Sequence, residues 1–289
     1  MIQKQIIFLF DGEFMNDKTI TVEPGIYSEM SYKDYCMQDA ITRRHLILDR
    51  NWQRTNYNLA VPKEDTEAMI LGRAVHAITL DAPSVDKDFL FTMEYPRTTK
   101  EGKEQWEADK ALAGSRTIIR GGEAFAIASA VTRHPGAARL LQEGSSEVSV
   151  FWKEGIDLCK ARLDYLRDGL IVELKTTQSA APRDFTREIV KYGYHFQAAW
   201  YRRGLSKALP VKGVAIIAVE KAAPYCVAVY HFTNAQLDRA EQVLLQRLED
   251  FRMCRETQHW TGYPDDSQEI NLPNWAFGDT DLDELTLDF

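Results

Sequence analysis

The sequence predicts an α/β protein with a mixed central β-sheet flanked by helices and with a helical N-terminal region. Three observations lead to this fold class. Strand-like segments cluster between residues 147 and 177, after a largely helical first part. Two helical stretches then precede two further strand-like segments, and a long amphipathic helix follows them. The order of helices, antiparallel strands, helices, strands and helix is typical of one α/β domain.

The composition is that of an ordinary globular protein. The chain has 289 residues, of which 45% are hydrophobic and 27% charged. These values exclude collagen-like proteins, disulfide scaffolds and disorder as the dominant state. The four cysteines are far apart in sequence, which excludes the usual zinc and iron–sulfur spacings. We find neither a signal peptide nor a run of apolar residues long enough to span a membrane, and so we expect a cytoplasmic protein without a membrane partner.

The acidic excess lies at the C-terminus. The chain has 43 acidic and 35 basic residues, a formal charge of -8. Eight of the acids, and no Lys or Arg, lie in residues 264–289. The net charge by itself argues against a nucleic-acid partner, but a neutral body can carry a basic face. We expect one domain over residues 1–263, made of N-terminal strands and a helix (1–62) and a core (63–263), followed by an acidic tail.

The N-terminal part is predicted to be mostly helical. Ser31 is a plausible helix N-cap, and Asp81-Ala82-Pro83 ends a helix whose apolar residues recur at helical spacing. The predicted elements are two strands around a turn at Asp11-Gly12, a helix over 31–49, a connector over 50–62, a helix over 64–80, a surface excursion over 83–110 and a helix over 118–133.

The second half contains the predicted sheet. Asp168-Gly169 is a tight-turn signal between two strands. Thr233 and Gln236 form a capping-box pattern at the start of the last helix. The predicted elements are an antiparallel meander over 147–153, 158–166 and 169–177, helices over 182–190 and 195–209, strands over 214–219 and 225–232, and the final helix.

Chemistry-bearing residues concentrate on the hairpin of this meander. Glu173 and Lys175 are two apart on a strand and so share a face, and the hairpin can bring Asp164 beside them. Carboxylates that meet beside an apolar strand need a partner, and Mg²⁺ is a cation that prefers such ligands. Such a site can activate water and stabilise charge on a phosphate, which Lys175 can assist.

The bare acid-x-Lys pattern is weak, because it also occurs at Glu101-Gly-Lys103. That copy lies in a polar stretch without strand character. The copy at Glu173 is crowded by Ile171, Val172 and Leu174, whereas a surface ion pair predicts alternating polar positions. The residues favour the metal site over the surface ion pair and leave both open.

Asp164 followed by Glu173-x-Lys175 resembles the PD-(D/E)xK nuclease superfamily. Gly72-x-x-x-His76 and Gln197-x-x-x-Tyr201 resemble two further motifs of its RecB-like and RecE-like branches. The lack of a cysteine cluster favours similarity to the RecE-type (exodeoxyribonuclease VIII) exonucleases of phage recombination systems. Leu163 stands where the superfamily name has proline, a departure that is common in the family.

The resemblance implies a restriction-endonuclease-like fold and assigns roles to residues. Asp164 and Glu173 would bind Mg²⁺, or Mn²⁺ in its place, together with the Leu174 carbonyl. His76 would be a metal ligand or lie just behind the ligands, and Lys175 would serve the attacking water. Gln197 and Tyr201 would brace the site or the DNA backbone. Glu147 also has a counterpart in the family.

The resemblance implies an activity as well. Such nucleases degrade the 5′ strand of linear double-stranded DNA ends and leave 3′ overhangs for single-strand-annealing recombination. They form ring-shaped homo-oligomers, here a trimer or tetramer, and act with a RecT-type annealing protein in the bacterial or phage-infected cell.

Other polar residues are candidates for supporting roles. Glu123 is a candidate carboxylate behind the ligands, and hydroxyl or basic groups can bind the DNA backbone without reading sequence. The candidates for backbone contacts are Thr176, Thr177, Gln178, Arg43, Arg44, Arg73, Lys160 and Arg162. Each also has an ordinary structural explanation, such as a strand cap, a packed helix polar residue or a surface ion pair. Two rival functions remain open: a restriction- or repair-type endonuclease, and a non-catalytic DNA-binding scaffold.

Overall fold

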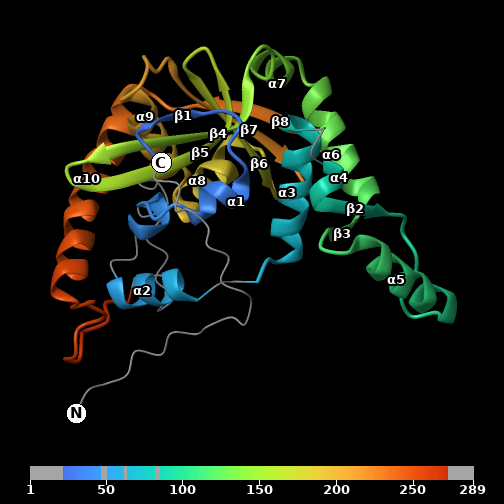
Figure 1. The fold of residues 1–289 in the computed structure, drawn as a ribbon, viewed down its shortest axis with the longest axis horizontal. Helices are drawn as coiled ribbons and strands as arrows, with labels where there is room; N and C mark the ends of the chain where they lie inside the picture. The colour runs from blue at the N-terminus through green and yellow to red at the C-terminus, as the bar shows by residue number, and fades with distance from the viewer. Residues whose placement is uncertain (1–21, 47–50, 62–63, 82–84, 273–289) are drawn as a thin grey trace. The chain divides into compact units, whose positions relative to one another are not determined.

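A computed structural model describes residues 22–46, 51–61, 64–81 and 85–272. It is built on a six-stranded mixed sheet in the order β1-β4-β5-β6-β7-β8 (Figure 1). The strands are β1 (Gly25–Tyr27), β4 (Ser145–Glu154), β5 (Asp157–Arg167), β6 (Leu170–Thr177), β7 (Gly213–Glu220) and β8 (Val227–His231). The predicted fold class, a mixed sheet flanked by helices, is therefore confirmed.

The sheet combines an antiparallel meander with one parallel crossover. β4, β5 and β6 pair antiparallel in sequence order, as predicted. The chain then passes through α8 (Pro182–Tyr192) and α9 (Tyr194–Ser206) and returns as β7, parallel to β6. This crossover places the carboxyl end of β6 next to the start of α8, where the site described below lies.

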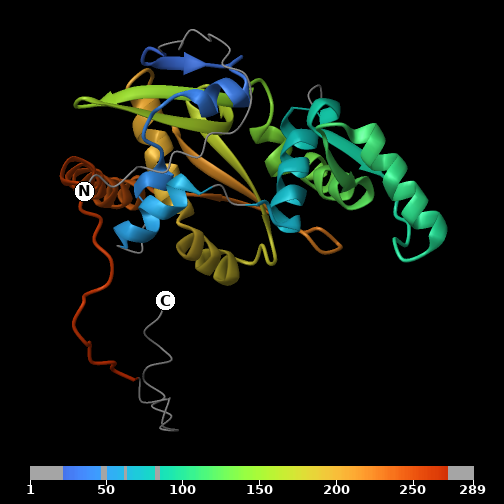
Figure 2. The same cartoon turned by 60° about the horizontal axis from the view of Figure 1, so that its bottom comes forward.

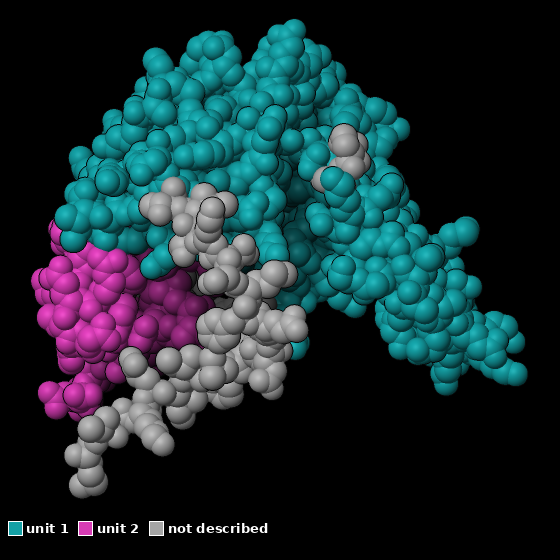
Figure 3. Space-filling model, viewed as in Figure 1, with its two compact units in different colours: residues 1–43, 64–245 teal, residues 44–63, 246–289 magenta. Residues whose placement is uncertain are grey.

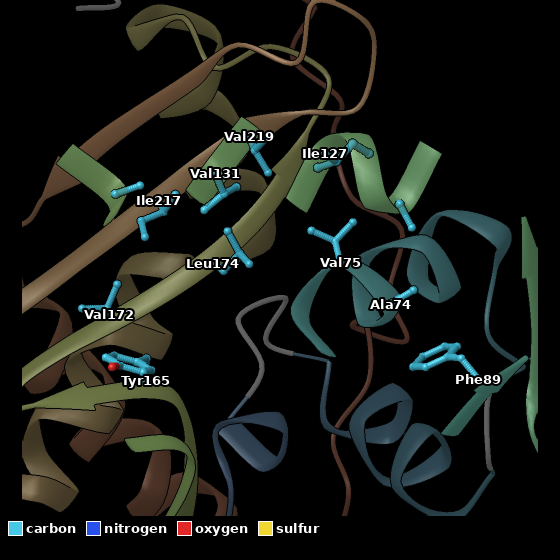
Figure 4. Packing of buried hydrophobic residues seen from close by; sticks show 12 residues of the cluster. Ala74, Val75, Phe89, Ile127, Val131, Tyr165, Val172, Leu174, Ile217 and Val219 are labelled. Carbon is cyan, nitrogen blue, oxygen red and sulfur yellow. The ribbon is translucent and has the colours of Figure 1, made fainter. Parts of the chain in front are cut away.

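Alternate residues of β7 explain how helices cover both faces of the sheet. Ile217 and Val219 pack in one buried cluster with residues of α3 (Glu67–Leu80) and α6 (Gly121–Arg133), part of which Figure 4 shows. Ile216 and Ala218 point the opposite way and pack with Phe185 of α8. The two-residue period of a strand thus gives each face its own apolar partner.

α9 is attached to the sheet by a charged cluster as well as by apolar packing. Glu154 on β4 accepts hydrogen bonds from Arg203 on α9 at both carboxylate oxygens, with distances of 2.7 and 2.6 Å. Burial alone would raise the pKa of Glu154, but the Arg203 guanidinium, with Lys207 and Trp152, holds this pKa below its ordinary value of 4.5. The ionised pair therefore contributes stability above pH 4.5.

Glu154→Gln is expected to lower the free energy of unfolding by about 1.5–2 kcal/mol near neutral pH, because Arg203 loses its charged partner. A group with a lowered folded pKa stabilises above its unfolded pKa, and this contribution disappears as pH falls through the folded pKa. Urea unfolding should therefore separate variant and wild type at neutral pH and show convergence well below pH 4.5. Glu104→Gln, which removes an exposed partner of Lys100, should change stability by less than about 0.5 kcal/mol; an equal effect of both variants would contradict the argument.

Two predicted elements between residues 31 and 62 are wrong. The helix expected over 31–49 is only α1 (Tyr32–Met37), followed by a 3₁₀ helix, Arg43–Leu46. Between them, Ile41 exchanges backbone hydrogen bonds with β5, and Lys160 donates to the carbonyl oxygens of Tyr35 and Gln38. These tertiary bonds override the helical pattern. The connector expected over 50–62 contains α2 (Trp52–Ala60), whose N-cap Asn51 accepts from the Arg54 backbone.

The expected surface excursion over 83–110 has regular structure. It contains α4 (Val85–Asp88), β2 (Phe89–Thr92) and α5 (Lys100–Ala113). β2 pairs in parallel with β3 (Thr117–Arg120), so the helix predicted over 118–133 begins only at Gly121, as α6. α7 (Pro135–Leu140) follows. The parallel partner of β3 is remote in sequence, and a local pattern could not reveal it.

The final helix, α10 (Asn234–Thr257), begins as predicted. Gln236 donates its backbone N–H to the Thr233 hydroxyl, and the Thr233 backbone N–H donates to the Gln236 side chain. The predicted strands around Asp11-Gly12 lie outside the described residues, as does most of the predicted tail. No helix among the described residues is long and apolar enough to cross a membrane.

The chain divides into two compact units (Figure 3). Unit 1 is formed by residues 1–43 and 64–245 and holds the sheet. Unit 2 is formed by residues 44–63 and 246–289. In unit 2 the ring of Phe251 contacts those of Trp52, His45 and Trp260, at centroid distances of 6.2, 5.4 and 5.8 Å. The predicted domain boundary after residue 263 stays a prediction.

Candidate active site

The two strands of the central hairpin separate where the polar residues lie. β5 and β6 pair at only three register positions, and the last is Tyr165 opposite Val172. Asp164 and Glu173 would occupy the next position. Beyond this point β5 stays paired with β4, and β6 stays paired with β7 along its whole length. Across this separation, each of the two carboxylates lies within hydrogen-bonding distance of a backbone N–H of the other strand.

Backbone groups orient both carboxylates. The Leu174 N–H donates to Oδ2 of Asp164 at 2.9 Å, and the Asp164 N–H lies 3.4 Å from Oε1 of Glu173. The Asp164 side chain is 15% exposed and that of Glu173 only 2% exposed. Two acidic groups are therefore held side by side with little access to bulk water.

Lys175 supplies the positive charge between them. Its Nζ lies 2.8 Å from Oε2 of Glu173 and 3.6 Å from Oδ2 of Asp164. The ring of Tyr194, which follows α8, lies 5.5 Å from the same Nζ. The ammonium group is thus fixed by both carboxylates, as the shared strand face predicted.

The pKa values show that the single ammonium group of Lys175 does not neutralise both carboxylates. Burial, and then the charge of Asp164, raise the pKa of Glu173 to about 8. For Asp164, burial is outweighed by Lys175 and His76, and its pKa is lowered. For Lys175, burial is outweighed by the two carboxylates, and its pKa is raised. Lys175 therefore stays protonated near neutral pH, and Glu173 would ionise more readily beside additional positive charge.

His76 reaches the site from α3. Its Nε2 lies 2.6 Å from the Leu174 carbonyl oxygen, and because a carbonyl can only accept, Nε2 carries the proton. Its Nδ1 lies 3.6 Å from Oδ2 of Asp164. One turn earlier, a Cβ on Gly72 would lie 3.4 Å from Oγ1 of Thr176 on β6. The lack of a larger side chain at Gly72 lets α3 lie close to β6, where His76 touches the site.

Gly72→Val is expected to lower the free energy of unfolding by about 1–3 kcal/mol and to move His76 away from Leu174, because branched atoms must fit against Thr176. Gly72→Ala adds only the Cβ, at ordinary contact distance, and should stay within about 1 kcal/mol of wild type. Thermal unfolding of both variants checks this order. Equal stability of Gly72→Val and wild type would show that the close approach is not required.

α9 contributes the predicted Gln197 and Tyr201. Nε2 of Gln197 donates to the Tyr201 hydroxyl at 2.8 Å. Burial, followed by the charges of Glu173 and Asp164, raises the pKa of Tyr201 well above its ordinary value. The hydroxyl therefore keeps its proton and can donate a hydrogen bond toward the acidic site. The three motifs of the sequence thus meet in one place.

Several other predicted residues have partners within the fold. Glu147 lies across from Asp164 in register, but its φ of 52° interrupts the ladder, and its carboxylate pairs with Nε of Arg162 at 2.7 Å. Arg162 also donates to the Met30 carbonyl oxygen and to Ser149. Lys160 is buried beneath α1. Glu147 and Arg162 thus form an ion pair with each other, and Lys160 is hydrogen-bonded to the backbone of α1.

The predicted hydroxyl and surface candidates differ in their accessibility. Thr177 is 1% exposed, and its hydroxyl donates to Glu188 of α8 at 2.7 Å, so it holds α8 rather than facing solvent. Thr176 lies against Gly72, as described above. Arg73 pairs with Asp65 at 2.7 Å on the exposed side of α3. Glu123 is exposed in the first turn of α6.

The last three candidates lie on loops and short helices. Arg43 donates to the Tyr192 carbonyl oxygen at the end of α8. Arg44 belongs to unit 2, where it donates to the Asn58 carbonyl oxygen. Gln178 is exposed just after β6. Sequence reasoning missed Tyr194, because an aromatic residue at a helix start has no motif spacing that would mark it.

The donor set suits a hard divalent cation. Asp164, Glu173 and the Leu174 carbonyl are oxygen donors of the kind that Mg²⁺ and Mn²⁺ prefer, and His76 lies beside them. The raised pKa of Glu173 indicates that additional positive charge nearby would stabilise its ionised form. Among the described residues, no group of three His, Cys, Asp or Glu side chains is arranged to hold a metal ion. Glu173 contacts Lys175 at 2.8 Å, so a metal ion bound by Glu173 would compete with this contact.

Comparisons with known proteins identify the family and the fold. The family described as "PDDEXK-like domain of unknown function (DUF3799)" matches residues 47–272. A crystal structure named "Putative exonuclease" from Eubacterium rectale is 12% identical, with a TM-score of 0.57 and coverage of 90% of this chain and 99% of that one. An alkaline exonuclease from Laribacter hongkongensis is 11% identical, with a TM-score of 0.33 and coverage of 76% of this chain and 91% of that one.

A search of curated proteins finds no match. The Eubacterium structure shares the fold, which supports the predicted restriction-endonuclease-like architecture. The family match spans most of the sequence and contains the whole hairpin with Asp164, Glu173 and Lys175. The chain therefore belongs to the PDDEXK-like DUF3799 family.

Proposed function

We propose that the protein is a Mg²⁺-dependent exodeoxyribonuclease that degrades the 5′ strand of linear double-stranded DNA and leaves 3′ overhangs for single-strand-annealing recombination. One observation carries the hydrolytic part of the proposal. Asp164, Glu173 and Lys175 meet where β5 and β6 separate, with His76 against the Leu174 carbonyl. Two carboxylates, an ammonium and a carbonyl at a strand opening are suited to phosphodiester hydrolysis.

The protein groups have distinct tasks in this chemistry. Asp164, Glu173 and the Leu174 carbonyl would hold Mg²⁺, which supplies charge neutralisation at the phosphate and lowers the pKa of water. Lys175 stays protonated, so it acts through its charge and its N–H donors, orienting the attacking water and stabilising the phosphorane-like charge. His76 orients the Leu174 carbonyl, and the protonated Tyr201 hydroxyl, which accepts from Gln197, is available as a hydrogen-bond donor.

The finer parts of the proposal rest on the resemblance of the motifs to RecE-type exonucleases. These parts are the 5′-strand polarity, a ring-shaped trimer or tetramer, and cooperation with a RecT-type annealing protein in the bacterial or phage-infected cell. Light scattering measures the molar mass in solution and so tests for a trimer or tetramer. A monomer at all micromolar concentrations would contradict the ring-shaped oligomer but would leave the proposed hydrolytic function unaffected.

A digestion experiment tests the substrate. Linear duplex labelled at either the 5′ or the 3′ end, and the same DNA as a closed circle, are incubated with the protein and Mg²⁺. We expect loss of the linear duplex with release of the 5′ label, and an intact circle. Cleavage of the circle would instead identify an endonuclease. Binding without cleavage of either form would identify a scaffold, and release of the 3′ label first would reverse the polarity.

A further inference from the structure

α8 carries a row of basic side chains on its outer face. Arg183, Arg187 and Lys191 are all exposed, and each is four residues from the next. Residues at this spacing lie on one side of a helix, with successive positions about 6 Å apart along its axis. Phe185, which is 1% exposed, packs with the sheet on nearly the opposite side. The row, which we term the α8 basic row, therefore faces away from the protein body.

Two acidic residues of the same helix accept hydrogen bonds from the protein. Asp184 accepts a hydrogen bond from the Ser179 hydroxyl at 2.9 Å. Glu188 accepts one from the Thr177 hydroxyl at 2.7 Å. Both acids thus contact the segment that leaves β6. The acids help to hold the helix in place, and the α8 basic row lies on its exposed side.

The α8 basic row lies beside the candidate active site. Thr177, which holds Glu188, is two residues after Lys175 on β6. At the other end of the helix, Tyr194 places its ring near Lys175. Figures 1 and 2 show α8 and α3 on opposite sides of the carboxyl end of β6. A polyanion that reaches the site from the α8 side would therefore pass the row.

We propose that the α8 basic row binds the phosphate backbone of the duplex DNA whose end is being hydrolysed. The argument rests on charge complementarity and on continuity with the site. Phosphates of one DNA strand recur every 3.4 Å along the duplex axis and also turn about it, so successive phosphates, roughly 7 Å apart in space, approximate the spacing of the row. Such contacts position a duplex without reading its sequence, which suits an enzyme that acts on any end. This inference rests on the proposed function.

The test measures binding of a fluorescent blunt duplex by fluorescence anisotropy over a range of salt concentrations. Lys175→Ala serves as the background in which hydrolysis is suppressed. To it we add either Arg183→Gln/Arg187→Gln/Lys191→Gln or the charge-conserving Arg183→Lys/Arg187→Lys/Lys191→Arg. A matched control, Lys100→Gln/Lys103→Gln/Lys110→Gln, removes the same charge from exposed positions of α5.

Neutralising the α8 basic row should weaken binding at least about tenfold at low salt and reduce the slope of log affinity against log salt by about 1 per contact. The charge-conserving variant and the α5 control should stay within about twofold of the background. Unchanged affinity and slope on neutralisation, or an equal loss in the α5 control, would overturn the inference while leaving the hydrolytic function intact. If the background fails to bind duplex at all, the proposed function fails together with the inference.

Discussion

Lys175→Ala is expected to lower the rate of DNA hydrolysis by about 10³-fold, because the variant loses a fixed charge where negative charge develops. Lys175 is held 2.8 Å from Glu173 and 3.6 Å from Asp164, and its pKa is raised, so it is charged under all ordinary conditions. A group so fixed needs no reorganisation as the phosphate reacts. Initial rates of nucleotide release from linear duplex in saturating Mg²⁺ measure the effect.

A matched control for Lys175 is present in the sequence. Lys103 also follows an acid by two residues, but it lies exposed on α5. Lys103→Ala should hydrolyse DNA at the wild-type rate. Circular dichroism must show that Lys175→Ala is folded, since its removal leaves Glu173 and Asp164 side by side. A folded Lys175→Ala variant with wild-type activity would exclude Lys175 from the mechanism.

Gly204→Ala is expected to lower the free energy of unfolding by about 3 kcal/mol, although alanine in a helix interior usually stabilises by about 0.5–1 kcal/mol. A Cβ on Gly204 of α9 would lie 2.4 Å from the Trp152 ring. That ring cannot yield easily, because it is 1% exposed, contacts Trp200 at 4.8 Å and donates to Glu154 at 2.9 Å. Overpacking therefore outweighs helix propensity. Urea unfolding measures the loss.

Gly122→Ala is the matched control for this substitution. Gly122 is also helical, in α6, and a Cβ there would meet no atom within 4 Å. The variant should be as stable as wild type or up to about 1 kcal/mol more stable. If Gly204→Ala behaved like Gly122→Ala, the close packing of α9 on β4 would not contribute to stability as we argue.

The sheet half of the fold could be predicted from the sequence because its signals are local. The Asp168-Gly169 turn and the alternating strands determine the meander, and the capping box at Thr233 determines the start of α10. The errors arise where distant partners decide the structure. Ile41 pairs with β5, and β3 pairs with β2. No local periodicity contains that information.

The candidate site shows the same division. The placement of Asp164, Glu173 and Lys175 follows from strand periodicity and a hairpin, whereas His76 is predicted from the resemblance of Gly72-x-x-x-His76 to a family motif. Glu147 could not be placed in this way, because a positive φ turns its backbone and Arg162 binds its carboxylate. Tyr194 was missed because its position depends on how α8 ends. The positions of side chains that depend on tertiary contacts cannot be predicted from local sequence patterns.

Mg²⁺-dependent hydrolysis of linear duplex by wild type and by Asp164→Asn tests the central claim most directly. The substitution keeps the shape of the side chain, including an oxygen for the Leu174 N–H, but removes the charge that a metal would need. We predict nucleotide release by wild type in Mg²⁺ and none above background in EDTA or from folded Asp164→Asn. Equal release by wild type in EDTA, or by Asp164→Asn in Mg²⁺, would contradict a metal-dependent site at Asp164.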